Sequence, residues 1–440
     1  MPSTSVRPAT TRRGLWGRHV RWSMAGLCSL SFVVNYIDRT TLSVALPYMS
    51  ADIHLTPTEQ GLALSAFFAT YALAQLPAGA LIDKHGVRRV FGIGAFVWGA
   101  VTMLMSLVRG PILLIIGRLV LGVGESVGYP GCAKVVSKWF PKSERALANS
   151  VWDNGSRVGA VIALPLVTGI VALFDWRWAF VFTGGLALLW VVLWFFTYRD
   201  PDRHPKLTAE ERALLVEGGA RLGDEETGAG PKIRWRSLFR YRTVWSMMIG
   251  FFCLNYVLFF FITWFPSYLV QERGFDLLKL GIFGVIPGIV AIGGSLLGGY
   301  TSDLLLRRGW SLTKARKTCL VSGLLLSSVI GGAVLVESAA AALVLLSISY
   351  ASLAFTGASI ASLPADVAPT ARQVSSLAGI QNFASNIAGV SGPLITGALV
   401  ALGGGSYLVP LLVSGAVAIA GAVVYGVGLR EVAPLPLPTQ

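Results

Sequence analysis

Long apolar segments recur along the whole of this 440-residue chain, and they constrain its fold more than any other feature. Each is about 20 residues or longer, enough to cross roughly 30 Å of hydrocarbon as a helix. The segments lack the alternation typical of barrel strands, and backbone groups in lipid must pair internally, which leaves helices. Charged residues make up only 13% of the chain, about half the fraction of a typical soluble protein. The sequence therefore predicts an all-α membrane protein.

We predict twelve membrane-spanning helices. Basic residues gather in alternate loops, which is the pattern of cytoplasmic loops, and this places both termini in the cytoplasm. The net charge of +14 follows from these loops and does not indicate a nucleic-acid partner. The spans are expected at 22–49, 58–82, 89–108, 111–137, 145–173, 177–198, 243–270, 279–306, 316–337, 340–366, 372–401 and 404–428.

One long hydrophilic segment separates the sixth span from the seventh and mixes acids with bases. Within it, Leu207–Leu215 has a threonine followed by acids, which predicts a short amphipathic helix on a solvated surface linker. The predicted division of the chain is an N-terminal tail at 1–21, a six-helix bundle at 22–198, a cytoplasmic linker at 199–242, a second six-helix bundle at 243–428 and a C-terminal tail at 429–440.

The two groups of six spans repeat each other in sequence. Asn35-Tyr36 recurs as Asn255-Tyr256, and the Gly79-x-x-x-Asp83 pattern recurs at Gly299 after the same offset of 220 residues. With an offset of 228, Asn154, Pro165, Thr168 and Gly169 match Asn382, Pro393, Thr396 and Gly397. Such a repeat implies two bundles related by an axis along the membrane normal, with a substrate site between them. The arrangement indicates a secondary transporter.

A polar cluster interrupts the first span: Asn35, Tyr36, Asp38 and Arg39. Residues three and four positions apart share one side of a helix, so Tyr36 and Asn35 lie on the same side of the helix as Arg39. A charge near the bilayer centre costs about 2.5–3.5 kcal/mol. The cluster therefore predicts a water-filled cavity or a charged ligand. The alternative is an ion pair that anchors the helix at the membrane surface, and the apolar residues on both sides argue against it.

Other deep charges also lie in the first half. Arg118 and Glu125 are seven residues apart, two turns along one helix face, with Gly122 and Gly124 leaving room for a neighbouring backbone. All four histidines fall in tails or loops, so proton carriage must use a deep carboxyl group. The candidates are Asp38, Glu125 and Asp153, and movement of Arg118 would switch Glu125 between protonation states. A static structural ion pair is the alternative for Asp38 and for Glu125.

The run from Gly79 to Arg89 resembles the signature between helices two and three of the major facilitator superfamily. There Gly79 would permit close helix approach, and Asp83 would pair with loop arginines such as Arg88 or with a helix N-terminus, so that the cluster latches one conformation. Within the superfamily, residues 22–428 resemble the anion:cation symporter family of aldonate, glucarate, hexuronate and aromatic-acid transporters. The resemblance rests on Asn35–Arg39, on the run from Arg118 through Glu125 to Gly131, on Trp139–Pro141 with Glu144-Arg145, and on Gln381–Gly389.

This resemblance implies the major facilitator fold, with twelve helices in two six-helix bundles. It also implies that Tyr36 and Arg39 contact the substrate carboxylate and that Asp38 and Glu125 carry protons. The fifth span departs from the family, because Arg157 stands where a small polar residue is expected. Arg157 either pairs with Asp153 four residues earlier or faces the cavity as a second cation. The predicted substrate site is completed by Tyr71, Asn154, Ser156, Ser359, Gln381 and Asn382.

The function predicted from the sequence is secondary active transport: proton-coupled uptake of a sugar acid, dicarboxylate or aromatic acid by alternating access. Exchange of one organic anion for another is the alternative, followed by a non-transporting membrane sensor on the same fold. No nucleophile–base set, metal-ligand spacing or phosphate loop occurs, so we expect neither an enzyme nor a metal or cofactor. We expect a monomer in the inner (plasma) membrane whose partners are the substrate anion, protons and lipid.

Overall fold

The computed structural model describes residues 20–141, 144–218, 220, 235–369 and 373–436. The helices of the first half are α1 (Val20–Asp52), α2 (Pro57–His85), α3 (Val87–Leu104), α4 (Pro111–Glu125), α5 (Gly128–Trp139), α6 (Arg145–Leu173) and α7 (Trp176–Thr197). Two short helices follow, α8 (Ala209–Glu217) and α9 (Trp235–Leu238). The second half contains α10 (Arg242–Thr263), α11 (Phe265–Gln271), α12 (Leu277–Phe283), α13 (Ile286–Arg307), α14 (Leu312–Ser327), α15 (Ala339–Val367), α16 (Gln373–Leu402) and α17 (Leu408–Val423).

Each predicted span corresponds to one helical rod, although three rods are broken into two helices. The broken rods are α4 with α5, α10 with α11, and α12 with α13, each interrupted for one or two residues. In the described part of the chain, ten rods are long and apolar enough to cross a membrane by length and composition. The other two, α1 and α2, are 33 and 29 residues long. The predicted all-α membrane fold is confirmed.

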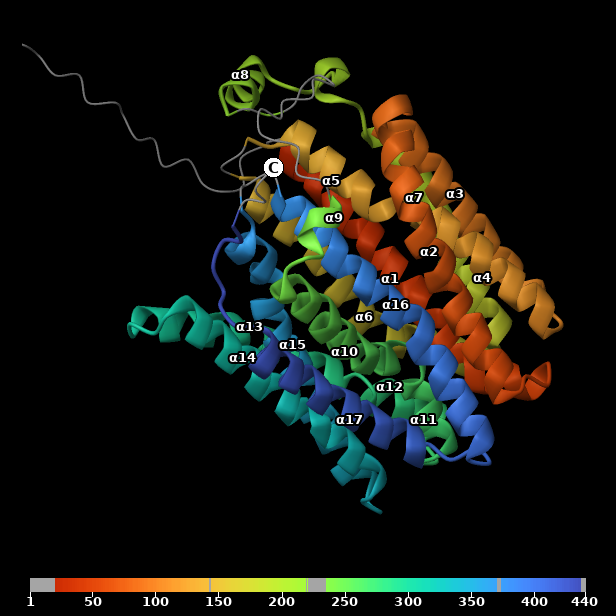
Figure 1. Cartoon of the computed structure of the whole chain (residues 1–440). Coiled ribbons are helices and arrows are strands. Elements are labelled where there is room, and N and C mark those ends of the chain that lie inside the picture. The colour runs from red at the N-terminus through yellow and green to blue at the C-terminus, as the bar shows by residue number, and fades with distance from the viewer. Residues whose placement is uncertain (1–19, 142–143, 219, 221–234, 370–372, 437–440) are drawn as a thin grey trace, which may run out of the picture.

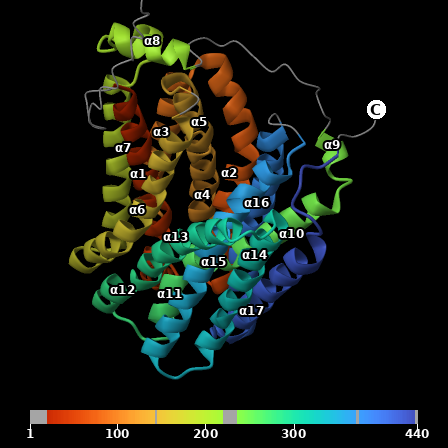
Figure 2. The same cartoon turned by 90° about the vertical axis from the view of Figure 1, so that its left-hand side faces the viewer.

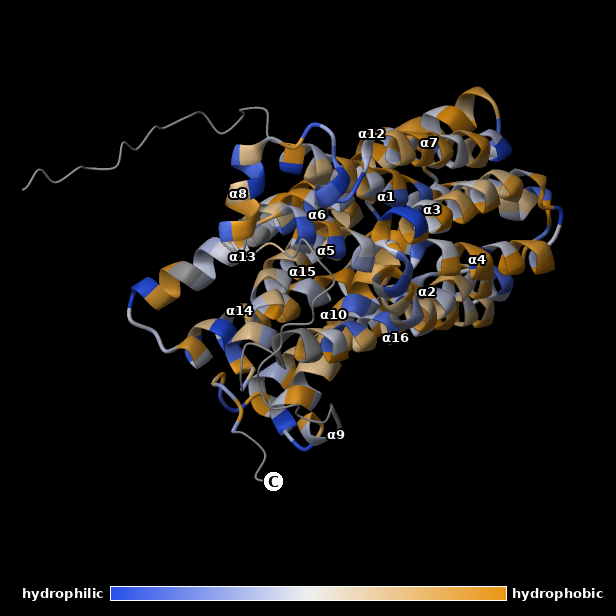
Figure 3. Cartoon of the chain, turned by 90° about the horizontal axis from the view of Figure 1, so that it is seen from above, coloured by the Kyte–Doolittle hydropathy of each residue, from blue (hydrophilic) through white to orange (hydrophobic). Residues whose placement is uncertain are grey.

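The rods form two bundles. Figures 1 and 2 show α1–α7, coloured red to yellow-green, on one side and α10–α17, coloured green to blue, on the other. In the first bundle α1 packs against α6 and α3 against α7, while in the second α13 packs against α15. Hydrophobic residues run along most of the helices, and hydrophilic residues gather near their ends (Figure 3). This is the distribution expected of helices that cross a bilayer.

The short linker helix α8 forms where the sequence predicts it, but it is not simply solvated. The Thr208 hydroxyl accepts a hydrogen bond from the Glu211 amide at 3.2 Å, which caps the helix as expected. The Glu211 carboxylate is buried and accepts hydrogen bonds from the amides of Val20 and Arg21, both at 3.2 Å. Glu211 thereby supplies acceptors for the first N–H groups of α1, which have no partner inside their own helix.

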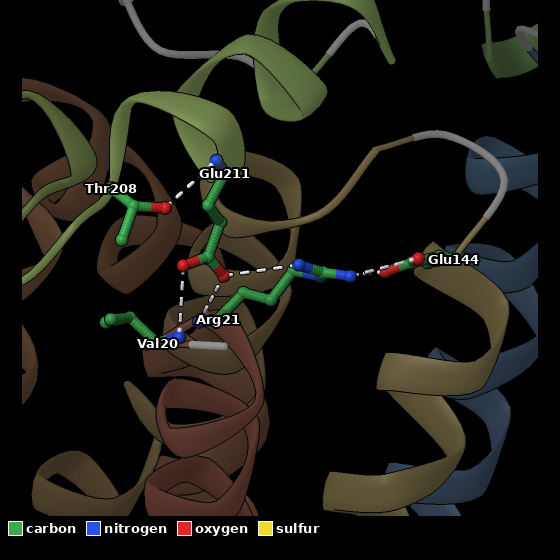
Figure 4. Close-up of polar contacts among 5 residues, drawn as sticks. All are labelled: Val20, Arg21, Glu144, Thr208 and Glu211. Carbon is green, nitrogen blue, oxygen red and sulfur yellow. Dashed lines mark hydrogen bonds and ion pairs between the residues drawn. The ribbon is translucent and has the colours of Figure 1, made fainter. Parts of the chain in front are cut away.

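Arg21 completes this attachment (Figure 4). Its guanidinium donates to Glu144, between α5 and α6, at 2.9 Å and to Glu211 at 3.2 Å. The exposed fraction of the Arg21 side chain is 6% and that of Glu211 is 2%. α8 is therefore a surface helix, as predicted, but its buried face, Glu211 and Leu215, is held on the first bundle by this ion pair and by the start of α1.

The two bundles meet through glycines at the end of the molecule opposite α8. A Cβ atom added to Gly61 of α2 would lie 2.8 Å from the Pro393 carbonyl oxygen of α16, and one added to Gly397 would lie 2.6 Å from the Pro57 carbonyl oxygen. A Cβ atom added to Gly281 of α12 would lie 2.6 Å from the Thr168 hydroxyl oxygen of α6, and the nearest backbone atom, of Pro165, would lie 3.9 Å away. Gly61 and Gly281 are 220 residues apart, so they belong to the internal repeat. The repeat therefore places a glycine at both contacts, but the backbones approach more closely at Gly61.

We expect Gly61→Ala to destabilise the purified protein. The added methyl group meets backbone atoms of the other bundle, and such overpacking costs about 1–3 kcal/mol. The matched control is Gly79→Ala, because no atom lies within 4 Å of its added Cβ. Replacing a helical glycine without a clash stabilises by roughly 0.4–1 kcal/mol. The measurement is the melting temperature of each variant, which should fall for Gly61→Ala and stay or rise for Gly79→Ala. Equal melting temperatures would contradict the close approach.

Candidate functional site

Four buried charged residues lie together in the first bundle, two acids and two arginines. Asp38 and Arg39 come from α1, and Arg118 and Glu125 come from α4. Asp38, Arg118 and Glu125 are 2–3% exposed, and the Arg39 side chain is 14% exposed. Burial of unpaired charge is costly, so the partners of each group decide what the cluster does.

Arg39 and Glu125 form the one direct ion pair of this cluster. Arg39 Nε donates to Glu125 Oε2 at 2.9 Å. The guanidinium carbon of Arg39 lies 4.8 Å from the ring centre of Tyr71, 5.0 Å from Phe67 and 5.3 Å from Tyr36. A guanidinium over aromatic faces gains electrostatic stabilisation. Three rings and one carboxylate therefore hold Arg39 in a defined position.

Arg118 does not pair with Glu125, contrary to the interaction that we expected from the sequence. Its Nε donates to the Ala63 carbonyl oxygen of α2 at 3.3 Å, and its guanidinium carbon lies 4.6 Å from the ring centre of Phe67. Seven residues span about 10 Å along a helix axis, so the two side chains must both reach far to meet. Arg39 approaches Glu125 from the neighbouring helix instead. Among the described residues no carboxylate oxygen lies within 4.0 Å of the Arg118 guanidinium.

Asp38 is bound by neutral donors of α3. Trp98 Nε1 donates to Asp38 Oδ2 at 2.9 Å, and Thr102 Oγ1 donates to the same oxygen at 3.0 Å. Asp38 and Arg39 are adjacent in sequence yet point to different helices. The close helix packing predicted at Gly124 is confirmed, because an added Cβ would lie 2.9 Å from the Trp98 amide nitrogen. The helices α3 and α4 therefore lie close enough to enclose both acids.

A cavity of about 10 Å³ adjoins the cluster, room for the centre of about one water molecule. Its lining includes Arg39, Tyr71, Trp98, Glu125 and Tyr129. Glu125 Oε1 is buried and has no hydrogen-bond partner within the described residues. A buried carboxylate oxygen without a donor carries a desolvation cost that no hydrogen bond offsets.

The other predicted substrate residues lie in different environments. Arg157 is half exposed, lies 3.6 Å from Asp153 and donates to Asn154 at 2.8 Å, so the pairing with Asp153 is present. Ser156 donates to the backbone of its own helix at 2.6 Å, and Asn382 is exposed. Ser359 and Gln381 are buried in the second bundle, each with an oxygen for which the described residues supply no hydrogen-bond partner. Tyr36 and Tyr71 lie beside Arg39, and the substrate-binding roles of all the predicted residues stay predictions.

The predicted latch looks different from its sequence-based description. No atom of the described residues lies within 4 Å of a Cβ added to Gly79, so this conformation shows no close helix approach there. Arg88 donates to the Phe195 carbonyl oxygen near the end of α7 at 2.6 Å, where the free carbonyl groups of a helix end accept such donors. The Asp83 side chain lies outside the described residues, so its pairing stays a prediction.

Sequence reasoning missed Phe67, Trp98 and Thr102 as parts of this cluster. Phe67 lies between Arg39 and Arg118, and both guanidinium groups lie over its ring. Trp98 and Thr102 are four residues apart and face Asp38 together. Their spacing was the available signal, but a tryptophan and a threonine in an apolar span also suit ordinary helix packing.

Comparison with known proteins agrees with the fold. The family model of the Major Facilitator Superfamily matches residues 28–373. The "Probable L-galactonate transporter" of Escherichia coli (strain K12) is 33% identical over 393 residues, 89% of this chain and 86% of the relative. The "Probable sulfoacetate transporter SauU" of Cupriavidus necator is 36% identical over 305 residues, 69% of this chain and 70% of the relative. The "D-galactonate transporter" of Escherichia coli O6:H1 is 34% identical over 311 residues, 69% of this chain and 72% of the relative.

A solved structure of a bacterial homolog to the human lysosomal transporter Spinster, in an inward-facing and unoccupied conformation, superposes with a TM-score of 0.77. It is 18% identical and covers 94% of this chain and 98% of its own length, so it supports the fold alone. The chain therefore belongs to the major facilitator superfamily. It is a multi-pass membrane transporter and not an enzyme, and it groups with the organic-anion transporters that its motifs indicated.

Proposed function

We propose that the protein takes up an organic carboxylate together with protons by alternating access. The observation that carries the proposal is the ion pair between Arg39 and Glu125. Three aromatic rings surround the guanidinium of this pair. An arginine held ready by a carboxylate of the protein can exchange that carboxylate for one of the substrate. A planar guanidinium matches a carboxylate with two parallel hydrogen bonds, which makes it a specific receptor for this group.

Proton coupling follows from the two oxygens of Glu125. Oε2 accepts from Arg39 Nε, which is always protonated, so an added proton goes to Oε1, the oxygen without a partner. Protonation removes the charge that attracts Arg39 and frees the guanidinium for the substrate. Release of the substrate restores the pair and favours loss of the proton. Substrate and proton binding therefore reinforce each other through one arginine.

Alternating access is supported by the glycine contacts between the bundles. With the α8 end in the cytoplasm, the contacts at Gly61 and Gly281 close the outer end of the molecule. We propose that this is an inward-facing conformation in the inner membrane, with both termini in the cytoplasm. The two bundles are 22–198 and 243–428, and a cytoplasmic linker at 199–242 joins them. One chain supplies the whole cluster, so the proposed transport unit is the monomer. A substrate shifts the equilibrium between the inward-facing and outward-facing conformations only if it binds the two with different affinity.

The proposed substrate class is a small acid with further polar groups. The relatives are named for galactonate, for galactarate and glucarate, and for sulfoacetate. These are a hydroxylated monocarboxylate, two dicarboxylates and a carboxylate with a sulfonate. Arg118 has no carboxylate partner in the described part of the chain and Arg157 is half exposed, so either offers a second cation for such substrates.

The test is uptake into proteoliposomes that contain the purified protein, with labelled galactonate, glucarate, sulfoacetate and benzoate. We expect a pH gradient, acidic outside, to drive accumulation of at least one acid, and a protonophore to abolish it. Accumulation that depends only on a counter-anion inside would replace proton coupling with exchange. Failure to transport any acid of the panel would overturn the proposed substrate class.

Arg157→Ser is expected to reduce uptake of diacids several-fold more than uptake of monoacids. The reason is that Arg157 donates to a neutral amide and lies 3.6 Å from a half-exposed acid, so its charge is only weakly compensated. The matched variant is Asp153→Asn, which removes the other member of the pair. The measurement is the ratio of glucarate to galactonate uptake. An equal loss of both acids in both variants would make the pair structural and remove the selectivity role.

A further inference from the structure

A second carboxyl group, Asp38, has an asymmetric environment that the exchange at Arg39 does not use. The hydrogen bonds that Asp38 accepts from Trp98 and Thr102 both end on Oδ2. The Glu125 carboxyl group of α4 also lies next to the Asp38 carboxyl group, and a carboxylate offers no N–H donor. An indole N–H can only donate, so it never accepts a proton from the carboxyl group. The two oxygens of Asp38 are therefore not equivalent.

We infer that Trp98 is a positioning residue that keeps Oδ2 of Asp38 free of protons and directs the titrating proton to Oδ1. Because an indole donor binds a carboxylate oxygen better than a protonated carboxyl group, it also favours release of that proton. Thr102 supports the same oxygen, but its hydroxyl can turn and accept instead. This inference rests on the proposed proton coupling. It adds a residue, Trp98, that lowers the affinity of the Asp38 carboxyl group for its proton.

Two helices supply the polar neighbours of the Asp38 carboxyl group. It interacts electrostatically with Arg118 and Glu125 of α4, and it accepts hydrogen bonds from the neutral donors Trp98 and Thr102 of α3. Trp98 also lines the cavity beside Arg39 and Glu125. A change at Trp98 leaves the charges in place, so its effect isolates the indole donor.

The decisive variant is Trp98→Phe, which keeps an aromatic ring and removes the N–H group. The matched control is Trp190→Phe. Trp190 is as buried as Trp98, at 2% exposed, and donates its N–H to α1 as well, but to the Leu27 carbonyl oxygen at 3.1 Å. Thr102→Val and Thr102→Ser form a second pair, since only serine keeps a hydroxyl donor.

The first measurement is independent of transport. Infrared difference spectroscopy of the purified protein follows the carbonyl band of the protonated Asp38 carboxyl group, assigned by its loss in Asp38→Asn. A hydrogen bond to a charged group favours the ionised form, so its removal raises the midpoint of titration by about one to two pH units. We expect that rise in Trp98→Phe, a smaller rise in Thr102→Val and none in Thr102→Ser or Trp190→Phe. An unchanged midpoint in Trp98→Phe overturns the inference.

The second measurement is the pH profile of gradient-driven uptake in the same variants. Trp98→Phe should move the profile to higher pH, and it should have no further effect when Asp38 is already asparagine. A loss of rate at every pH without a shift of the profile would assign Trp98 to packing alone. If the wild-type protein transports acids at a rate that does not depend on the pH gradient, the proposed proton coupling fails. The midpoint of the Asp38 titration, measured by infrared spectroscopy, still tests the role of Trp98 in that case.

Discussion

Arg39→Lys is expected to lose about 100-fold in substrate affinity although the charge is retained. Lysine offers a compact point charge and cannot form two parallel hydrogen bonds with a carboxylate. A hydrogen bond to a charged group contributes about 1.5–3 kcal/mol, and 2.7 kcal/mol corresponds to about 100-fold. The measurement is the affinity of purified protein for the acid that gives the highest uptake. Near-normal affinity would remove Arg39 from the binding site.

The chain offers a close control for this variant. Arg316 of α14 is 12% exposed at its side chain, and its Nε donates to Asp366 at 2.8 Å, much as Arg39 donates to Glu125. It lies in the second bundle and outside the proposed site. We expect Arg316→Lys to bind the substrate like the wild-type protein. A similar loss in both variants would reflect damage to the fold and not to substrate binding.

Glu125→Gln is expected to abolish accumulation driven by a pH gradient while exchange of substrate across the membrane continues. The amide imitates the protonated acid, leaves Arg39 free and cannot release a proton. One coupled proton supports an accumulation ratio of up to tenfold for each pH unit, so the ratio should fall to about one. The measurement is counterflow beside pH-driven uptake in the same vesicles.

The control for Glu125→Gln is Asp366→Asn, which removes a carboxylate from a partly buried ion pair with an arginine. We expect this control to keep its accumulation. Full accumulation by Glu125→Gln would mean that the proton travels through Asp38 or Asp153. Loss of counterflow together with accumulation would mean that Glu125 is needed for substrate binding or for folding.

The sequence by itself determined the fold class and the membrane architecture. A helix that crosses the bilayer must be long and apolar, and each such helix is recognisable from its own segment of the sequence. The repeat was also readable, because matched residues such as Pro165 with Pro393 keep their spacing within each half. The capped linker helix was readable for the same reason: Thr208 and Glu211 are three residues apart, and a helix cap depends only on neighbours in sequence.

Only the tertiary structure decided which charged groups pair. Spacing along one helix suggested that Arg118 serves Glu125, but Glu125 binds Arg39 from another helix. The sequence predicts which face of a helix a side chain occupies, but it does not report how neighbouring helices are rotated or how far their side chains reach. Trp98 therefore remained hidden as the partner of Asp38, and Gly61 remained hidden as a contact between bundles. Both depend on helices that are distant in the chain and adjacent in space.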